Sequence, residues 1–308
     1  MARTSTILIA GPTASGKSAL ALALAERLGG EVINADSMQV YRELEILTAR
    51  PSAADRRRAP HRLYGHVPAA QAYSAGRFVA EAGAAIGTAH AAGRVAIVVG
   101  GTGLYLRALT EGLAPIPAVP EEIRARWRGQ AAVEGAAALH AMLADRDPAM
   151  AARLRPSDAQ RVTRALEVLE ATGRSLAEWQ AQPGTPLDGI DRAVRLVVEV
   201  ERRELYRRCD ARLAAMISAG ALEEVRALTA LGLPADLPAL RAVGVAPLAR
   251  HLAGEVGLQE AVRLAATETR QYAKRQLTWL RRNMITWNTI FSHEMEQTER
   301  DALSFIDY

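Results

Sequence analysis

The amino-acid sequence predicts an α/β fold in which a parallel sheet is flanked by helices and carries an inserted all-helical lobe. Short apolar, β-branched runs at residues 6–10, 32–35 and 95–99 alternate with stretches of helical composition at residues 18–28 and 73–93. This alternation is typical of a doubly wound sheet, whose ligands bind at the carboxyl ends of the strands.

A long interval before the next strand predicts the inserted lobe. The fourth apolar run, residues 194–200, begins nearly a hundred residues after the third. The interval has helical composition, carries nearly balanced charge and is interrupted by Pro115, Pro117, Pro120, Pro148, Pro156, Pro183 and Pro186. We therefore expect a core from residues 1–112 and 192–308, and a helical lobe from residues 113–191. Further helices are expected at residues 204–219, 221–231 and 258–282.

The composition excludes several classes of protein. With 49% hydrophobic residues in 308, the chain can bury a sizeable core. No stretch reaches the roughly 18 apolar residues of a membrane span. The single cysteine, Cys209, excludes an intramolecular disulfide and a cysteine-rich metal cluster, which suits a reducing compartment. The apolar run near the N-terminus leads directly into a glycine loop, which favours a buried strand over a secretory signal. We expect a cytoplasmic monomer with no membrane partner.

The distribution of basic residues is informative. A formal charge of +4 is compatible with a nucleic-acid partner but does not argue strongly for one. Of the 38 basic residues, only Lys17 and Lys274 are lysines. In a chain so biased toward arginine, these positions suit a compact ammonium better than a planar guanidinium. For Lys274, survival by chance is an open alternative.

Residues 11–18, GPTASGKS, match the pattern G-x-x-x-x-G-K-[ST] at Gly11, Gly16, Lys17 and Ser18. Glycines allow the backbone to direct its N–H groups at phosphate oxygens, and the following helix adds its positive end. The lysine neutralises charge and the Ser18 hydroxyl can bind Mg²⁺. Because a predicted strand precedes the loop and a predicted helix follows it, the motif indicates a diphosphate or triphosphate site in a P-loop NTPase-like fold. A merely structural glycine turn would not explain the retained lysine.

A candidate acid or base follows the second strand. Asp36 lies just beyond residues 32–35, where side chains face the ligand crevice of such a sheet. Its carboxylate could hold Mg²⁺ through water or accept a proton from a nucleophile. The alternative is an aspartate that only caps the next turn.

Seven segments together resemble the tRNA dimethylallyltransferase family. They are, in order, GPTASGKS, ADSMQVYRELEILTARP, PHRLYGHV, YSAGRF, VGGTGLYLRAL, QRVTRALEV and TRQYAKRQLTWLRRN. The resemblance extends from about residue 6 to residue 285. It implies transfer of a dimethylallyl group from dimethylallyl diphosphate to N6 of adenosine 37, beside the anticodon of tRNA, with release of diphosphate.

The resemblance also implies roles for the loop. The diphosphate would be held by Gly11, Pro12, Thr13, Ala14, Ser15, Gly16, Lys17 and Ser18, with Mg²⁺ as the cofactor and Ser18 as its ligand. An aromatic amine is a poor nucleophile, so a base must accept its proton, and Asp36 is the candidate. The leaving diphosphate gains negative charge, which Lys17 and the metal would stabilise. Alignment with the family adds Arg212 as a further catalytic cation, although a solvated helix arginine is the alternative. Because water would hydrolyse the donor, we expect a closed channel.

Contacts with the anticodon stem-loop are also implied by the resemblance. They involve Asp36, Ser37, Met38, Gln39, Thr102, Arg124, Gln160, Arg161, Val162, Thr163, Arg164, Arg241, Lys274, Arg275, Gln276 and Arg281. Arg161 and Arg164 are spaced i and i+3 on one helix, which suits adjacent phosphates. A solvated helix face is the alternative for this pair.

Two details concern the C-terminal part. In the last long helix, the spacing of Ala273, Leu277 and Leu280 predicts a buried stripe. Arg270, Lys274 and Arg281 lie on another side and predict a cationic strip. Residues 241–246 read RAVGVA where the family usually carries an aromatic residue and a following cation. An RNA contact from the side chains of Val245 or Ala246 is therefore in doubt.

Two other functions fit the phosphate loop. A small-molecule or nucleoside kinase that uses ATP would share the loop, the sheet and Asp36. Such a kinase needs neither the helical lobe nor the C-terminal cationic helix. An RNA-binding protein that keeps the loop as a structural turn is the non-enzymatic alternative.

Overall fold

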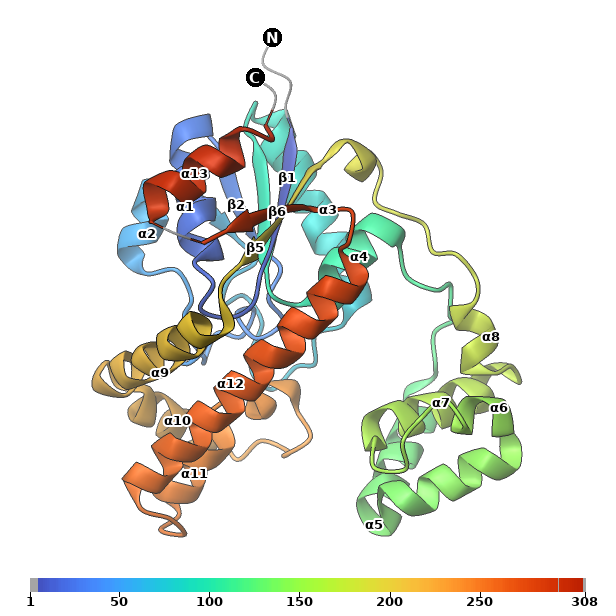
Figure 1. Ribbon diagram of the computed structural model, residues 1–308. Helices are drawn as coiled ribbons and strands as arrows, with labels where there is room; N and C mark the ends of the chain where they lie inside the picture. Colours follow the sequence, from blue (N-terminus) through green and yellow to red (C-terminus); the bar gives the residue numbers. More distant parts are fainter. Residues whose placement is uncertain (1–4, 293, 307–308) are drawn as a thin grey trace. The chain divides into compact units, whose positions relative to one another are not determined.

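Within residues 5–292 and 294–306, which the computed structural model describes, six parallel strands form one sheet in the order β3-β2-β4-β1-β5-β6 (Figure 1). The strands are β1 (Thr6–Ala10), β2 (Glu31–Asn34), β3 (His61–Arg62), β4 (Ala96–Gly100), β5 (Val194–Glu199) and β6 (Asn288–Phe291). The predicted fold class, a parallel sheet flanked by helices, is confirmed.

The sequence predicts four of these strands, β1, β2, β4 and β5, to within one residue at every boundary. β3 was not predicted because it has only two residues. β6 was not predicted either, because only Ile290 of its four residues is buried and the strand therefore lacks an apolar pattern. β6 is recognisable only through its pairing with β5.

Alternate side chains of the central strands enter two different cores. Ile7 and Ile9 of β1 pack in the core that contains Leu20 of α1 (Lys17–Leu28) and Ala302 of α13 (Met295–Leu303). Leu8 faces the other core, which includes buried residues of α3 (Ala75–Ala91) and α4 (Gly103–Glu111). Both faces of β1 are thus buried, as the continuous apolar run requires.

A group of helices follows β5 and packs together (Figure 1). Its members are α9 (Arg202–Ser218), α10 (Ala221–Ala230), α11 (Val245–Leu252) and α12 (Leu258–Asn283). Ala273, Leu277 and Leu280 of α12 are all buried, which confirms the predicted stripe. α11 was not predicted, nor were α2 (Ala53–Arg58), α13 and the 3-10 turns η1 (Ile190–Arg192) and η2 (Pro238–Arg241).

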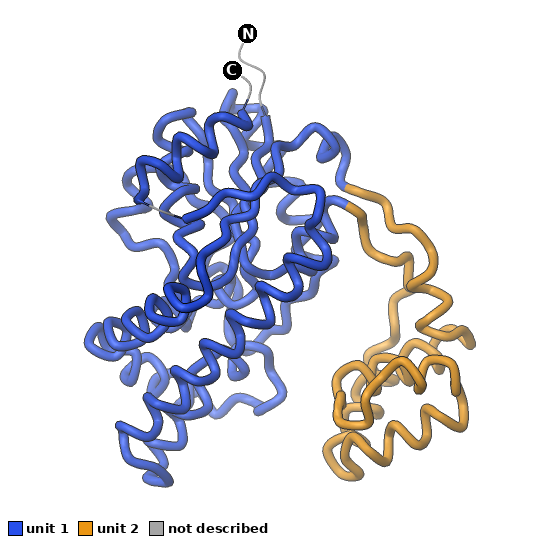
Figure 2. Tube along the Cα trace, in the orientation of Figure 1, with its two compact units in different colours: residues 1–110, 187–308 blue, residues 111–186 orange. Residues whose placement is uncertain are grey.

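The chain divides into two compact units, residues 1–110 with 187–308, and residues 111–186 (Figure 2). The second unit contains α5 (Glu121–Arg146), α6 (Pro148–Ala151), α7 (Ala159–Thr172) and α8 (Leu176–Gln180). Its own core is built around Trp127, Leu139 and Leu166, and the Trp127 indole donates to Glu170 at 2.9 Å. The sequence predicts this lobe at residues 113–191, so its start lies two residues and its end five residues beyond those of the compact unit.

The end of β4 requires a residue without a side chain. A Cβ at Gly100 would lie 2.0 Å from the carbonyl oxygen of Ala35. This close approach brings the carboxyl ends of β2 and β4 together at the edge where the phosphate loop begins.

We predict that Gly100→Ala lowers the free energy of unfolding by about 1–3 kcal/mol, because a backbone oxygen would have to move. Gly87→Ala is the matched control, since Gly87 is an exposed α3 residue whose added Cβ would meet nothing within 4 Å. This control should raise stability by about 0.5–1 kcal/mol. Urea unfolding midpoints measure both effects, and an unchanged midpoint for Gly100→Ala would contradict the prediction.

Candidate active site

The phosphate loop connects β1 to α1. Gly16 precedes the helix with a φ of 89°, and Ala14 also has a positive φ, 62°. Gly16 has no side chain to cap the helix, and the first turn of α1 carries no acidic residue. The Lys17 N–H donates to the Ser15 hydroxyl at 3.4 Å. The N–H groups of Ser18 and Ala19 are available to an anion, which the helix dipole also favours.

The Lys17 ammonium turns back into this loop and donates to the carbonyl oxygen of Pro12 at 3.1 Å. Burial lowers the pKa of Lys17 to about 8, the negative charge of Asp36 opposes this shift, and the positive charge of Arg212 adds to it. A bound phosphate would stabilise the charged lysine and raise its pKa again.

Gln276 of α12 holds the phosphate loop to the turn after β4 through two hydrogen bonds. Its Oε1 accepts from the backbone N–H of Thr13 at 2.8 Å, and its Nε2 donates to the carbonyl oxygen of Gly101 at 2.9 Å. The side chain is only 6% exposed. The prediction that Gln276 contacts tRNA is therefore corrected, because both ends of its amide are used inside the protein.

Asp36 follows β2 and is held in a defined orientation. Its Oδ1 accepts from the backbone N–H of Met38 at 2.9 Å, so the turn-capping role is real. The buried Asn34 amide binds the Asp36 backbone on both sides, with Nδ2 to the carbonyl at 3.0 Å and Oδ1 from the N–H at 2.8 Å. Oδ2 of Asp36 has no hydrogen-bond partner among the described residues, so the carboxylate can cap the turn and still accept a proton.

Thr102 joins this segment to the turn after β4. Its Oγ1 accepts from the backbone N–H of Ser37 at 2.9 Å and lies 3.2 Å from the Ser37 hydroxyl. A Cβ on the neighbouring Gly101 would lie 2.3 Å from Gln276 Nε2, so the glycine permits the bracing amide to approach.

A cavity of about 260 Å³ lies between Thr13 of the loop, Asp36 and the helices that follow β5. Its polar lining includes Thr13, Asp36, Ser37, Thr48, Cys209, Arg212, Arg241, Thr269 and Arg275. Its remaining lining comes from Met38, Leu47, Leu213, Met216, Ala242, Val243 and Tyr272. One cavity thus combines arginine side chains and a residue of the loop with apolar side chains.

Arg212 reaches the phosphate loop from α9. Its guanidinium donates to the Thr13 hydroxyl, and burial lowers the pKa of Arg212. The alternative of a solvated helix arginine is therefore wrong. Cys209, Leu213 and Met216 share its helix face at helical spacing, a pattern that could have identified them from the sequence.

Two further residues near the loop were missed. Arg208 of α9 donates to the Ser292 hydroxyl at 2.9 Å, and a Cβ at Gly16 would lie 3.4 Å from that hydroxyl oxygen. Ser292 follows β6, whose position only the sheet defines. No sequence pattern points to it.

The segment 241–246 forms a turn and the start of α11. Gly244 has a φ of 91°, Arg241 and Val243 line the cavity, and Val245 is buried. The Val245 side chain is therefore not available to RNA.

The outer face of α12 carries the predicted cations. Arg270 donates to Asp210 at 2.7 Å, and Arg281 donates to Glu199 at 3.4 Å. Lys274 has no carboxylate partner in residues 5–292 and 294–306. It lines a groove of about 300 Å³ with Arg202, Leu277, Thr278, Arg281 and Arg282. Of the predicted strip, Lys274 is the cation with the least internal compensation.

The lobe residues form a separate set in the second unit. Gln160 and Arg161 are exposed, whereas Val162 is fully buried and Thr163 is 7% exposed. The predictions of RNA contacts by the Val162 and Thr163 side chains are therefore corrected, because both are buried within the lobe. Arg164 donates to the buried Glu167 at 3.2 Å.

Arg124 and Gln39 have different surroundings. In the lobe, Arg124 Nε is buried with no hydrogen-bond partner among the described residues, and Nη1 lies 3.8 Å from Glu121. In the core unit, Gln39 donates to the carbonyl oxygens of Thr48 and Ala49 at 2.7 and 3.1 Å. Its amide nitrogen therefore stabilises a loop.

None of the helices in residues 5–292 and 294–306 has the length and hydropathy needed to cross a membrane. Proteins with this sheet bind phosphorylated ligands at the loop after the first strand, and here the loop opens on a cavity with apolar walls. The fold and the cavity therefore define an enzyme class that binds a phosphorylated donor carrying an apolar group.

Comparison with known proteins identifies the family. Residues 39–283 match the family model described as "IPP transferase", and residues 4–68 match "Isopentenyl transferase". Curated tRNA dimethylallyltransferases of Parvibaculum lavamentivorans and Rhodospirillum centenum are 54% and 58% identical. The first alignment covers 98% of this chain and 95% of the relative, and the second covers 89% and 88%.

Solved structures agree. The tRNA isopentenylpyrophosphate transferase of Bacillus halodurans has a TM-score of 0.69 at 32% identity, covering 98% of this chain and 95% of that one. A eukaryotic dimethylallyltransferase acting on tRNA has a TM-score of 0.82 at 28% identity, covering 97% and 77%. The chain belongs to the IPP transferase family and is a prenyltransferase enzyme. The resemblance noted in the sequence is confirmed, and the kinase alternative is not supported.

We predict that Lys17→Met raises the free energy of unfolding at pH 7 by about 1–3 kcal/mol, allowing for its partial exposure. The folded-state pKa of Lys17, about 8, lies below the ordinary lysine value of 10.5, so between these values the unfolded state holds more protons. Wild-type stability should therefore rise with pH across this window, and the advantage of the variant should shrink.

Urea unfolding at pH 7 and pH 9.5 measures this difference. Lys274→Met is the matched control, since Lys274 is exposed and a surface substitution there should change the free energy of unfolding by less than about 0.5 kcal/mol. A Lys17→Met variant that is less stable than wild type at pH 7 would contradict the prediction.

Proposed function

We propose that the protein transfers a dimethylallyl group from dimethylallyl diphosphate to N6 of adenosine 37 in the tRNA anticodon loop and releases diphosphate. The single observation that carries the assignment of roles is the shared cavity. Thr13 and Arg212 at the phosphate loop, the Asp36 carboxylate and several apolar side chains all line it. The relatives indicate the class of reaction. The cavity indicates a role for the loop, for Arg212, for Asp36 and for the apolar side chains.

The donor would bind with its diphosphate at the loop and its allyl group against the apolar wall. Lys17, the N–H groups at the start of α1 and the Arg212 guanidinium are cationic or hydrogen-bond donors. As the C1–O bond breaks, its electron pair remains on the diphosphate, whose increasing charge these groups stabilise. The apolar side chains limit the access of water to the allyl carbon.

Asp36 would act as the base. When N6 of the adenine forms its bond to C1, the amine proton has to leave, and Asp36 Oδ2 is the free carboxylate oxygen in the cavity. Oδ1 remains bound to the Met38 N–H, so the carboxylate keeps its orientation throughout. The proton moves to Asp36 and the carbon–oxygen electrons leave with the diphosphate, so the step is balanced.

The residues present fit a magnesium ion. The Ser18 hydroxyl is exposed at the start of α1 and makes no hydrogen bond with the residues that the structure describes. In that part of the chain there is no cluster of three acidic, histidine or cysteine ligands, as expected if phosphate oxygens and water complete the shell. We propose that Ser18 holds Mg²⁺, which when bound would neutralise diphosphate charge.

The tRNA would approach the cavity through its anticodon loop. A base in a single-stranded loop can be extruded at low energetic cost, which allows N6 to enter the cavity. Lys274 and Arg275 of α12 are exposed cations, and Arg275 also lines the cavity. Arg161 of the lobe is 76% exposed, which suits a phosphate contact. We propose that the protein acts in the cytoplasm as a monomer.

The direct test is incubation with unmodified tRNA, Mg²⁺ and labelled dimethylallyl diphosphate in the absence of ATP. Label should enter the RNA, and mass analysis of the nucleosides should locate it on one adenosine. A matched anticodon stem-loop with purine at position 37 lacks the N6 amine and should remain unlabelled. Transfer of the terminal phosphate of ATP to any acceptor would overturn the proposal.

We predict that Asp36→Asn lowers kcat by about 10²–10⁴, because the amide keeps an oxygen for the Met38 N–H but accepts no proton. The affinity for tRNA should change little. Asp210→Asn is the control, since Asp210 is exposed on α9 and does not line the cavity. Equal losses in turnover and in tRNA affinity would rule out Asp36 as the base.

A further inference from the structure

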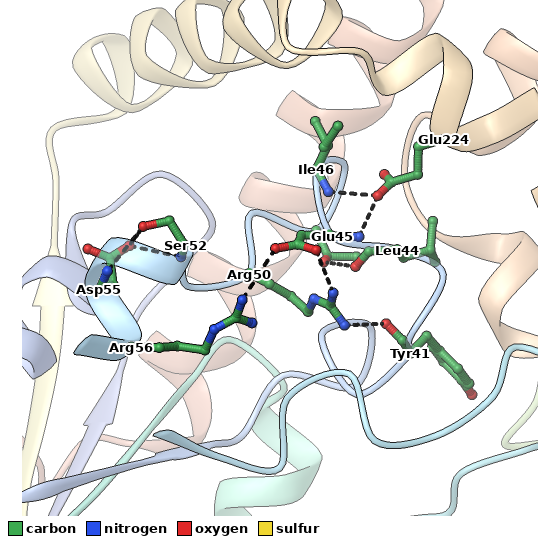
Figure 3. Close-up of polar contacts among 10 residues, drawn as sticks. Tyr41, Leu44, Glu45, Ile46, Arg50, Ser52, Asp55, Arg56 and Glu224 are labelled. Atoms are coloured by element: carbon green, nitrogen blue, oxygen red, sulfur yellow. Dashed lines mark hydrogen bonds and ion pairs between the residues drawn. The ribbon is translucent and has the colours of Figure 1, made fainter. Parts of the chain in front are cut away.

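One carboxylate outside the cavity binds three consecutive backbone N–H groups of a loop. Figure 3 shows its bonds to Glu45 and Ile46. Glu224, in the first turn of α10, accepts from the N–H of Glu45 and from that of Ile46 at 2.7 Å through Oε1. Its Oε2 accepts from the N–H of Leu47 at 2.9 Å. Hydrogen bonds to an ionised acceptor are stronger than neutral ones, so Glu224 is a strong anchor for this loop.

The same loop is fixed on its other side. Arg50, with only 7% of its side chain exposed, donates to the Tyr41 carbonyl at 3.1 Å and to the Glu45 carboxylate at 3.0 Å (Figure 3). Gln39 donates to the carbonyl of Thr48 at 2.7 Å. Glu224 therefore holds the backbone of residues 45–47, Gln39 holds the Thr48 carbonyl and Arg50 holds the Glu45 side chain, although the segment 44–48 contains no helix or strand.

The anchored segment supplies part of the cavity wall. The Leu47 and Thr48 side chains line the cavity, immediately after the backbone that Glu224 binds. A Cβ at Gly244 would lie 3.5 Å from Leu47 Cδ2, so Leu47 also packs against the turn that carries Val243. A movement of residues 45–47 would therefore move one side of the apolar wall.

We propose that Glu224 is a positioning residue that determines the length of the allyl donor by fixing the Leu47 wall. This inference rests on the proposed function, because the wall limits chain length only if a donor binds at the phosphate loop. With Glu224 in place, the wall stops the hydrocarbon after the dimethylallyl group. Without it, residues 45–47 can retreat and admit a longer chain.

The first measurement is independent of the reaction. In the Glu224→Gln variant one acceptor oxygen and the negative charge are lost, so hydrogen exchange of the amides of residues 45–47 should become faster. Glu223→Gln is the matched control on the same turn of α10, because Glu223 is exposed and pairs only with Arg226 in the described structure. The control should exchange at the wild-type rate, and unchanged exchange in Glu224→Gln would overturn the anchoring role.

The second measurement compares donors of five and ten carbons, dimethylallyl and geranyl diphosphate. In Glu224→Gln, the ratio of kcat/KM for the longer donor to that for the shorter one should rise roughly tenfold. KM for dimethylallyl diphosphate should rise while KM for tRNA stays within about twofold, a split that general destabilisation would not produce. Leu47→Ala, which shortens the wall directly, should raise the same ratio even if Glu224→Gln folds poorly.

Several results would overturn the proposal. Faster exchange with an unchanged donor ratio in both variants would show that the wall does not select the donor. A rise in KM for tRNA alone would show that the wall contacts the RNA instead. If the wild-type protein failed to use dimethylallyl diphosphate at all, the proposed function would fail, whereas the exchange result would still stand.

Discussion

The active site depends on one buried amide that joins the phosphate loop to the last long helix. Gln276 accepts from Thr13 and donates to Gly101, so it ties together the loop after β1, the turn after β4 and α12. A side-chain amide suits this position because it offers a donor and an acceptor at once. Loss of either bond would leave a buried polar group unpaired, which costs more than a hydrogen bond contributes.

The cavity above this amide is assembled from distant parts of the chain. Thr13, Asp36, Arg212 and Arg275 line it together. Parallel strands make this possible, since each strand delivers its following loop to the same edge of the sheet. The helices α9 and α12 then close the cavity from the side, and the anchored segment 44–48 completes its wall.

The buried cations Lys17 and Arg212 lower the stability of the folded protein and favour the binding of an anion. Burial lowers the pKa of Lys17 and of Arg212, which means that the charged form of each is less stable here than in water. A diphosphate bound near both groups, as proposed, would reverse that penalty. The site therefore holds unfavourable charge that a ligand of opposite charge relieves, which is the electrostatic preorganisation that a leaving anion needs.

By itself, the sequence determined the central strands, the phosphate-loop motif, the place of Asp36 after β2 and the buried stripe of α12, because each has a local pattern. Arg212 was indicated only by a family resemblance. Tertiary structure alone decided the rest. The Gln276 brace, the Glu224 anchor and the place of Ser292 arise from contacts between residues far apart in the chain. Such side chains have no periodicity or motif, since a hydrogen bond to a distant backbone group depends on where the fold places both partners. For the same reason, the local sequence motifs could not predict that Val162 and Gln276 are buried.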